Sequence, residues 1–209
     1  MAHAHARRRP PISPSLVWLL SSLVLAAAFP HSNLSAQARS APFETLDLSV
    51  TLLADINHGT MNRYWSPGPA FAVGVALPFH LGTVETGMQY AHPKALRGDV
   101  PGFRSLFIYA GWGGGYDLGR RLRAGAGFRV GVQAMRFDGD SLPAFRRRES
   151  ELSVAARAGM RWAPVGPWFL ETSATYQSIL TRPRMEQVFL SAGLGRRFRT
   201  AAWLRDFLD

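Results

Sequence analysis

The chain has 209 residues, with 24 Lys and Arg against 14 Asp and Glu, a net charge of +10, and no cysteine. The lack of cysteine excludes disulfide bonds, thiolate metal sites and thiol catalysis. The basic balance is compatible with an anionic partner such as nucleic acid or an acidic membrane surface.

The first 38 residues have the layout of a secretory signal peptide. The basic run Arg7–Arg9 precedes an apolar stretch, Leu16–Phe29, and Ala36-Gln37-Ala38 supplies a cleavage site of small residues. The apolar stretch is too short for a transmembrane helix, although a single membrane anchor is the alternative. Its removal leaves 171 residues, enough for one domain, with a charge of +7, because three arginines and no acidic residue leave. Sec and twin-arginine export both remain open. An exported chain rarely meets nucleic acid, so anionic lipid or lipopolysaccharide is the expected partner of the basic chain.

The rest of the chain predicts eight β-strands. In Leu122–Met135 the even positions are Leu, Ala, Phe or Val, whereas the odd positions are Arg, Gly or Gln until the final Met. Alternation with period two indicates a strand, and one this long suits a tilted bilayer crossing better than a soluble sheet. The same pattern predicts strands over Glu44–Asp55, Ala70–Phe79, Leu81–Tyr90, Phe103–Tyr116, Arg121–Arg136, Glu149–Trp162, Trp168–Ile179 and Gln187–Phe198.

Long and short connections alternate between these strands. The connections over 56–69, 91–102 and 137–148 are long, those around 78–80, 117–120 and 163–167 are short, and 180–186 is moderate. An up-and-down barrel places alternate connections at opposite ends. Outer-membrane barrels have short periplasmic turns and longer extracellular loops. We therefore predict an all-β fold, an eight-stranded antiparallel up-and-down transmembrane β-barrel.

Two features favour an apolar face that points outward into lipid. The polar face is rich in Gly and Ser, which suits the inside of a narrow barrel. The apolar face ends in aromatic residues near the short turns, where we expect a girdle at the periplasmic interface. This predicted girdle consists of Phe79, Tyr116, Trp162, Trp168 and Phe198, with Tyr90, Tyr64 and Trp65 expected at the outer interface. The alternative is a secreted lipocalin-like carrier with the apolar face inward.

Over Glu44–Phe198 the pattern resembles the small eight-stranded outer-membrane barrels, the OmpA/OmpX-like β-barrel family. The resemblance rests on the strand pattern and on the last strand, Val188–Phe198, which ends on an aromatic residue like the signal that the barrel insertion machinery reads. It implies a bacterial outer-membrane location and a monomer. The chain departs from the family by continuing to Asp209. We expect a signal peptide over 1–38, a barrel over 39–198 and a tail over 199–209 that forms a short amphipathic helix.

An eight-stranded barrel has an interior just wide enough for side chains, which argues against a wide pore. Buried charges are costly unless they are paired, so we expect Arg–carboxylate pairs in a filled lumen. The alternative is a narrow or gated ion path. The charged residues predicted to face the lumen are Asp47, Glu85, Arg123, Arg129, Glu151, Arg157, Arg161 and Glu171.

The loop before the sixth predicted strand is the most charged surface segment. Its arginines Arg146, Arg147 and Arg148 are candidates for contact with lipid phosphates, although a solvated basic loop is the simpler interpretation. Asp138 and Asp140 lack the other ligands that calcium requires. We predict no metal site and no cofactor.

An enzyme that acts on lipid A or phospholipid is the alternative from another functional class. Ser141 beside Asp140, with His58 or His92 from other loops, offers the parts of a hydrolase. No spacing links them, and the chain has no Gly-x-Ser-x-Gly motif. We therefore predict no catalytic residues and a role in envelope structure or in surface contact through the long loops.

Overall fold

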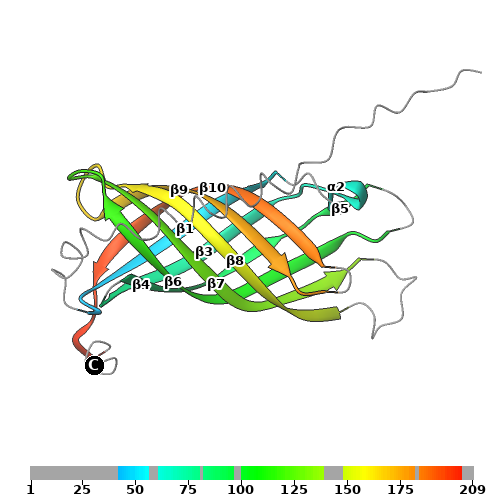
Figure 1. Cartoon of the computed structure of the whole chain (residues 1–209), viewed down its shortest axis with the longest axis horizontal. Coiled ribbons are helices and arrows are strands. Elements are labelled where there is room, and N and C mark those ends of the chain that lie inside the picture. The colour runs from blue at the N-terminus through cyan, green and yellow to red at the C-terminus, as the bar shows by residue number, and fades with distance from the viewer. Residues whose placement is uncertain are drawn as a thin grey trace, which may run out of the picture.

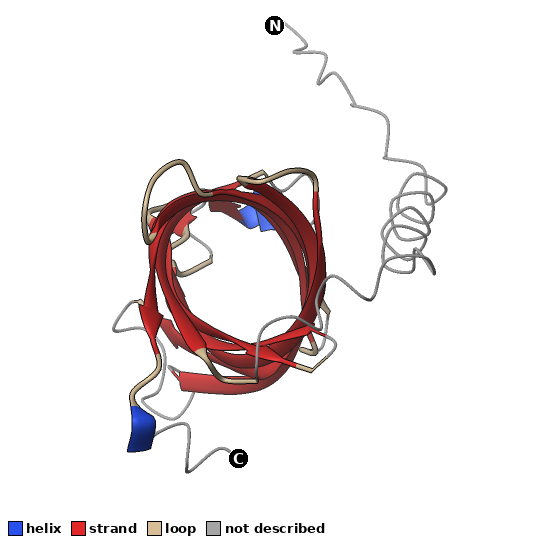
Figure 2. Cartoon of the chain, turned by 90° about the vertical axis from the view of Figure 1, so that its left-hand side faces the viewer, coloured by secondary structure: helices blue, strands red, loops and turns tan. Residues whose placement is uncertain are grey.

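The computed structural model describes residues 42–56, 61–80, 82–96, 100–138, 148–181 and 184–203. They form a closed antiparallel barrel with the strand order β1-β10-β9-β8-β7-β6-β4-β3, in which β3 pairs with β1 again (Figure 1). Seen from the end that carries the short turns, the strands form a complete ring (Figure 2). The barrel strands are β1 (Thr45–Asp55), β3 (Ala70–Phe79), β4 (Gly82–Ala91), β6 (Phe103–Asp117), β7 (Leu122–Phe137), β8 (Arg148–Trp162), β9 (Trp168–Ile179) and β10 (Met185–Arg199).

These strands confirm the predicted fold class. Two of them, Ala70–Phe79 and Trp168–Ile179, have the predicted bounds. The largest shift is at the start of β10, which begins at Met185 instead of Gln187. The short turns and the C-terminal end of β10 lie at one end of the barrel, here called the turn end. The longer connections, with α2 and β5, lie at the other, the loop end (Figure 1).

The apolar face points outward and the polar face points into the lumen. Leu52 is 71% exposed and Ile108 56%, whereas Gln177 is fully buried. The carrier alternative is therefore wrong, because an inward apolar cavity requires the opposite orientation of every strand. Within the described ranges, no helix is long and apolar enough to cross a membrane.

Three short elements at the loop end were not predicted. They are α2 (Met61–Tyr64), β2 (Trp65–Ser66) and β5 (Lys94–Ala95), and β2 pairs with β5 in a small separate sheet. Elements of two to four residues are too short to show a periodic pattern, so the alternation could not indicate them.

Trp65 does not lie at the outer lipid interface as expected. Its ring packs edge-on against Phe103, with centroids 5.3 Å apart, and its Nε1 donates a hydrogen bond to the Pro101 carbonyl at 2.8 Å. Tyr64 packs against Trp65 at the same end. The expectation for Trp65 was wrong because its ring packs on the buried apolar cluster of the loop end instead of facing lipid. Tyr90 is on the outward face of β4, 5.4 Å from the Phe71 ring.

Candidate functional site

The turn half of the lumen contains a network of arginine and carboxylate side chains. Its carboxylates come from three separate strands: Asp47 on β1, Glu85 on β4 and Glu171 on β9. Its arginines come from β7, β8 and β10. Strand alternation places all of them inward, and the closed ring brings residues far apart in sequence to one level. The network consists of Asp47, Glu85, Arg129, Arg157, Arg161, Glu171 and Arg197.

The pairs form a continuous chain across the barrel. Arg129 binds Glu85 in bidentate fashion, at 2.7 Å from Nε and 3.0 Å from Nη2. Arg157 lies 3.6 Å from Glu85 and 3.4 Å from Glu171. Arg161 then joins Glu171, at 3.3 Å, to Asp47, at 2.5 Å. Each carboxylate is shared by two arginines, which offsets the desolvation that a lone buried charge would suffer.

Arg197 belongs to the network although it was not among the predicted lumen residues. Its Nε and Nη2 donate to the two Asp47 oxygens at 2.8 and 3.0 Å. A usable signal existed, because every second residue of β10 from Gln187 onward faces inward and Arg197 continues that series. It was missed because it lies in the arginine pair at the end of the strand.

Two predicted lumen residues lie outside the network. The Nε of Arg123 is 3.9 Å from an Asp117 oxygen at the mouth of the barrel, away from the three shared carboxylates. Glu151 pairs in register with Gln133, nearer the loop end, and it forms no ion pair within the described ranges. Alternation gives the face of a residue but not its depth, which explains both differences.

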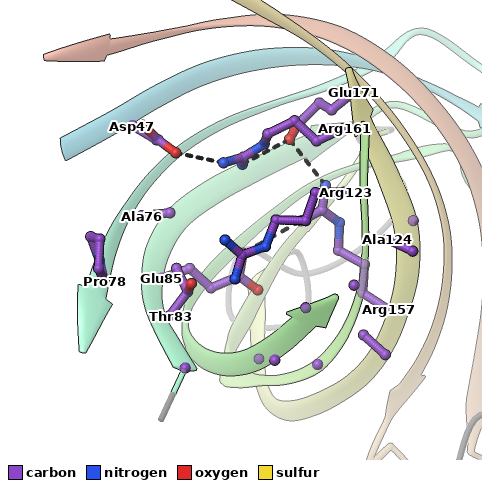
Figure 3. Close-up of a pocket in the computed structure, with 18 of the residues that line it drawn as sticks. Asp47, Ala76, Pro78, Thr83, Glu85, Arg123, Ala124, Arg157, Arg161 and Glu171 are labelled. Atoms are coloured by element: carbon purple, nitrogen blue, oxygen red, sulfur yellow. Dashed lines mark hydrogen bonds and ion pairs between the residues drawn. The ribbon is translucent and has the colours of Figure 1, made fainter. Parts of the chain in front are cut away.

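A cavity of about 270 Å³ lies beside the network and extends to the turn end, where Pro78 and His80 line it (Figure 3). Glycines of β6 and β7 leave the space for it. A Cβ at Gly115 would lie 2.6 Å from the Nε of Arg123, and one at Gly111 would lie 3.1 Å from both the Glu85 and Arg129 side chains. Glycine at these positions therefore makes room for the charged side chains.

The loop half of the lumen is filled instead by amide and apolar side chains. Gln177 donates from its Nε2 to Gln133 at 2.8 Å and to Ser153 at 2.9 Å, and it accepts from Gln89 at 3.2 Å. Apolar side chains pack around and above these amides. This assembly, called the plug below, consists of Gln89, Gln133, Ser153, Gln177, Phe103, Phe107, Phe189, Met61, Met135 and Ile179.

The predicted girdle residues lie on the outward face near the turn end. Tyr116, Trp162 and Trp168 are 46–47% exposed and Phe198 39%. Phe79 packs against the Phe43 ring at 5.4 Å. The guanidinium of Arg196 lies over the rings of both Trp168 and Phe198, at 5.3 and 5.1 Å. A band of rings with a cation beside it is typical of a lipid–water interface.

Three arginines form a row on the outside of the barrel at the loop end. Arg104 on β6 is directly opposite Arg136 on β7, which is directly opposite Arg148 on β8. All three are exposed. The neighbouring loop residues Arg146 and Arg147 lie outside the described residues. Arg148 thus has partners on adjacent strands that the sequence did not indicate.

The parts of the alternative hydrolase are not brought together by the described structure. Ser141, Asp140 and His58 lie outside the described residues. His92 lies 3.4 Å from the Asp138 carboxylate, which also lies 3.6 Å from Arg104. Asp138 is therefore engaged with the His92 ring and the Arg104 guanidinium, and the described residues contain no group of three or more potential metal ligands.

Comparison with known proteins supports the fold. No protein-family model matches the chain, and no curated protein matches its sequence. Among solved structures, Neisserial surface protein A is similar at 12% identity, covering 76% of this chain and all of that one, with a TM-score of 0.59. The N-terminal β-barrel domain of Pseudomonas aeruginosa OprF is similar at 13% identity, covering 76% and 100%, with a TM-score of 0.52. The chain therefore has the fold of the small eight-stranded outer-membrane barrels.

Proposed function

We propose that this chain is a bacterial outer-membrane protein, exported by residues 1–38 and inserted as a barrel over 39–198 with a short tail over 199–209. The observation that carries the proposal is the exposed apolar belt around a closed ring of strands. A closed barrel pairs its backbone N–H and C=O groups between strands, which hydrocarbon surroundings require. In water, an outward face with Leu52, Ile108 and Phe128 all more than half exposed would drive aggregation.

Its role is structural, or it makes surface contacts through the loop end, and it carries out no catalysis. The plug fills the loop half of the lumen, so the barrel supplies no wide solute path. The small β2–β5 sheet and the contacts of Trp65 with Phe103 and Pro101 give the loop end a folded surface. A shaped surface of this kind is suited to contact with other molecules outside the cell.

The gel mobility of the protein from purified outer membranes, with and without boiling in SDS, tests the location and the fold together. We expect a shift on boiling, because a membrane barrel resists SDS until it is heated. Recovery in the soluble periplasmic fraction without a shift would contradict the proposal.

Outer-leaflet lipid is the partner that the row of arginines fits. Arg104 and Arg136 lie two residues beyond the apolar Leu106 and Ala134, and Arg148 lies two residues beyond Ser150, roughly 7 Å further along each tilted strand. The row therefore lies at the edge of the apolar belt, at the level of lipid phosphates. Arginine binds phosphate through paired N–H groups, so the phosphates of lipopolysaccharide are suitable ligands.

The last strand fits the signal that the barrel insertion machinery reads. β10 ends at Arg199, and Phe198 presents an outward ring one residue before that end. The tail after β10 also contains two aromatic residues, Trp203 and Phe207. Replacing Phe198 with Ala while leaving these two intact would show whether the machinery reads the end of β10 or the tail. We expect the Phe198 variant to accumulate in the periplasm, whereas normal assembly of this variant would place the signal in the tail.

A further inference from the structure

We propose that the cavity at the turn end is a binding pocket for a small oxyanion of the phosphate type, which enters from the turn end and leaves by the same route. This goes beyond the proposed structural role, which needs only a filled barrel. The pocket is lined by Arg123, Arg157, Arg161 and Arg197 and by glycines of β6 and β7. Figure 3 shows the first three of these arginines around it.

Positive charge is in excess around this space. The lining holds four arginines against the three carboxylates of Asp47, Glu85 and Glu171, and each carboxylate is already shared by two arginines. At the same end of the barrel, the exposed Arg120, Arg121 and Arg199 outnumber the exposed carboxylates Glu44 and Asp117. A cleft of one predominant sign within low-dielectric walls concentrates the field and attracts counter-ions. The pocket therefore favours an anion over a cation.

Two guanidinium groups at the mouth are available to an entering anion. The Arg123 side chain lies over Gly115, and its contact with Asp117 is a distant one of 3.9 Å. The Arg197 side chain is 52% exposed although it is bound to Asp47. A guanidinium carries five N–H donors, so a bidentate pair with one carboxylate leaves donors for a second acceptor. Tetrahedral oxyanions match this arrangement of several converging donors.

The space itself argues for a ligand. The interior of an eight-stranded barrel is normally filled by side chains, and the loop half follows this rule. In the turn half, Gly113, Gly125 and Gly127 leave room where the arginines converge. The volume of about 270 Å³ exceeds what one or two waters occupy, at roughly 30 Å³ each. Because the plug fills the other half, the cavity is a blind pocket instead of a passage.

The test is a titration of the ¹⁵N-labelled chain, purified in a non-ionic maltoside detergent, with sodium phosphate at constant ionic strength and pH. The side-chain Nε–H signals of arginine report binding directly. We expect the signals of Arg123 and Arg197 to shift and saturate. Arg123→Gln removes a mouth cation outside the shared network and should weaken phosphate binding roughly tenfold. Arg63→Gln, at an exposed arginine of α2 at the opposite end of the barrel, is the control and should leave the affinity unchanged.

A second variant separates the pocket from general surface charge. Ala76 lines the cavity on β3, and Ala76→Leu fills space there while keeping every arginine. It should abolish saturable binding, and a mobility shift on boiling will show that the variant is folded. Equal affinity in Ala76→Leu and the unaltered chain, or shifts that do not saturate, would overturn the proposal. Competition by glycerol 3-phosphate alone would assign a soluble ligand, and competition by dihexanoyl phosphatidic acid as well would assign a lipid headgroup in the same pocket.

Discussion

The two halves of the lumen are closed in physically different ways. In the loop half, Phe103, Phe107 and Phe189 are at most 1% exposed, and the buried polar side chains are uncharged amides and hydroxyls. In the turn half, formal charges dominate and a cavity remains beside them. One half is sealed by packing and neutral hydrogen bonds, whereas the other is held by ion pairs that water can approach.

This difference shows where a narrow barrel can place charge. Moving an ion away from water costs several kcal/mol unless good partners and hydrogen bonds offset the loss. The network lies next to the open end, so its outer members, such as Arg197, stay partly hydrated. Amides, which cost less to bury, occupy the dry half. The lumen thus grades from charged and hydrated to neutral and dry along its axis.

The largest effect is expected from removing one charge of the network. Glu85→Gln takes away the partner of both Arg129 and Arg157 and leaves buried positive charge unbalanced. We expect the free energy of unfolding to fall by about 3 kcal/mol. Urea unfolding in micelles, followed by tryptophan fluorescence, measures it. Glu44→Gln, an exposed carboxylate just before β1, is the control and should change little. Equal stability of the two variants would show that the turn half does not depend on pairing.

A smaller loss is expected from the neutral half. Gln177→Leu keeps a similar volume but removes the side chain that hydrogen-bonds Gln89, Gln133 and Ser153. These groups are then left buried without that partner, which should cost about 2 kcal/mol in the same unfolding assay. Thr172→Leu, on the outward face of the same strand, is the matched control. A loss for Gln177→Leu larger than that for Glu85→Gln would reverse the proposed order of the two halves.

The sequence predicts the barrel because the alternation of inward and outward side chains is a local property of each strand. Alternation with period two records which face each residue occupies, and a residue such as Arg129 or Gln133 can be assigned to a face from its neighbours alone. The apolar residues of the plug were harder to predict from the sequence. On β6 the inward residues Phe103 and Phe107 are as apolar as the outward ones, so alternation of polarity is weak there.

Depth and register were not available from the sequence. Whether Arg123 reaches Glu171 or Asp117 depends on how far each strand is shifted against the next, and the pattern is unchanged by a shift of two residues. The row of Arg104, Arg136 and Arg148 is invisible for the same reason, because it exists only in the observed register. Trp65 was misplaced because a short helix of the connection, which has no periodic signature, sets its position.

The smallest expected effect is an increase in the free energy of unfolding, and it comes from an arginine on the outside of the loop half. Arg136 has an arginine directly opposite it on each neighbouring strand, and like charges in such pairs destabilise a sheet. Arg136→Gln should therefore raise the free energy of unfolding by about 0.5 kcal/mol in lipid-free maltoside micelles. In bilayers that contain lipopolysaccharide the gain should disappear, because the unaltered row then binds phosphate and its repulsion is offset.

Arg120→Gln is the control for this sign change, since Arg120 is an exposed arginine in the β6–β7 turn at the opposite end. It should change stability little in either medium. Lipopolysaccharide that co-purifies with the barrel, measured through its phosphate, should fall for Arg136→Gln and stay constant for Arg120→Gln. If Arg136→Gln stabilises the barrel equally in both media, the row has no phosphate ligand. The outer surface would then lack the contrast between a lipid-binding loop end and an aromatic turn end.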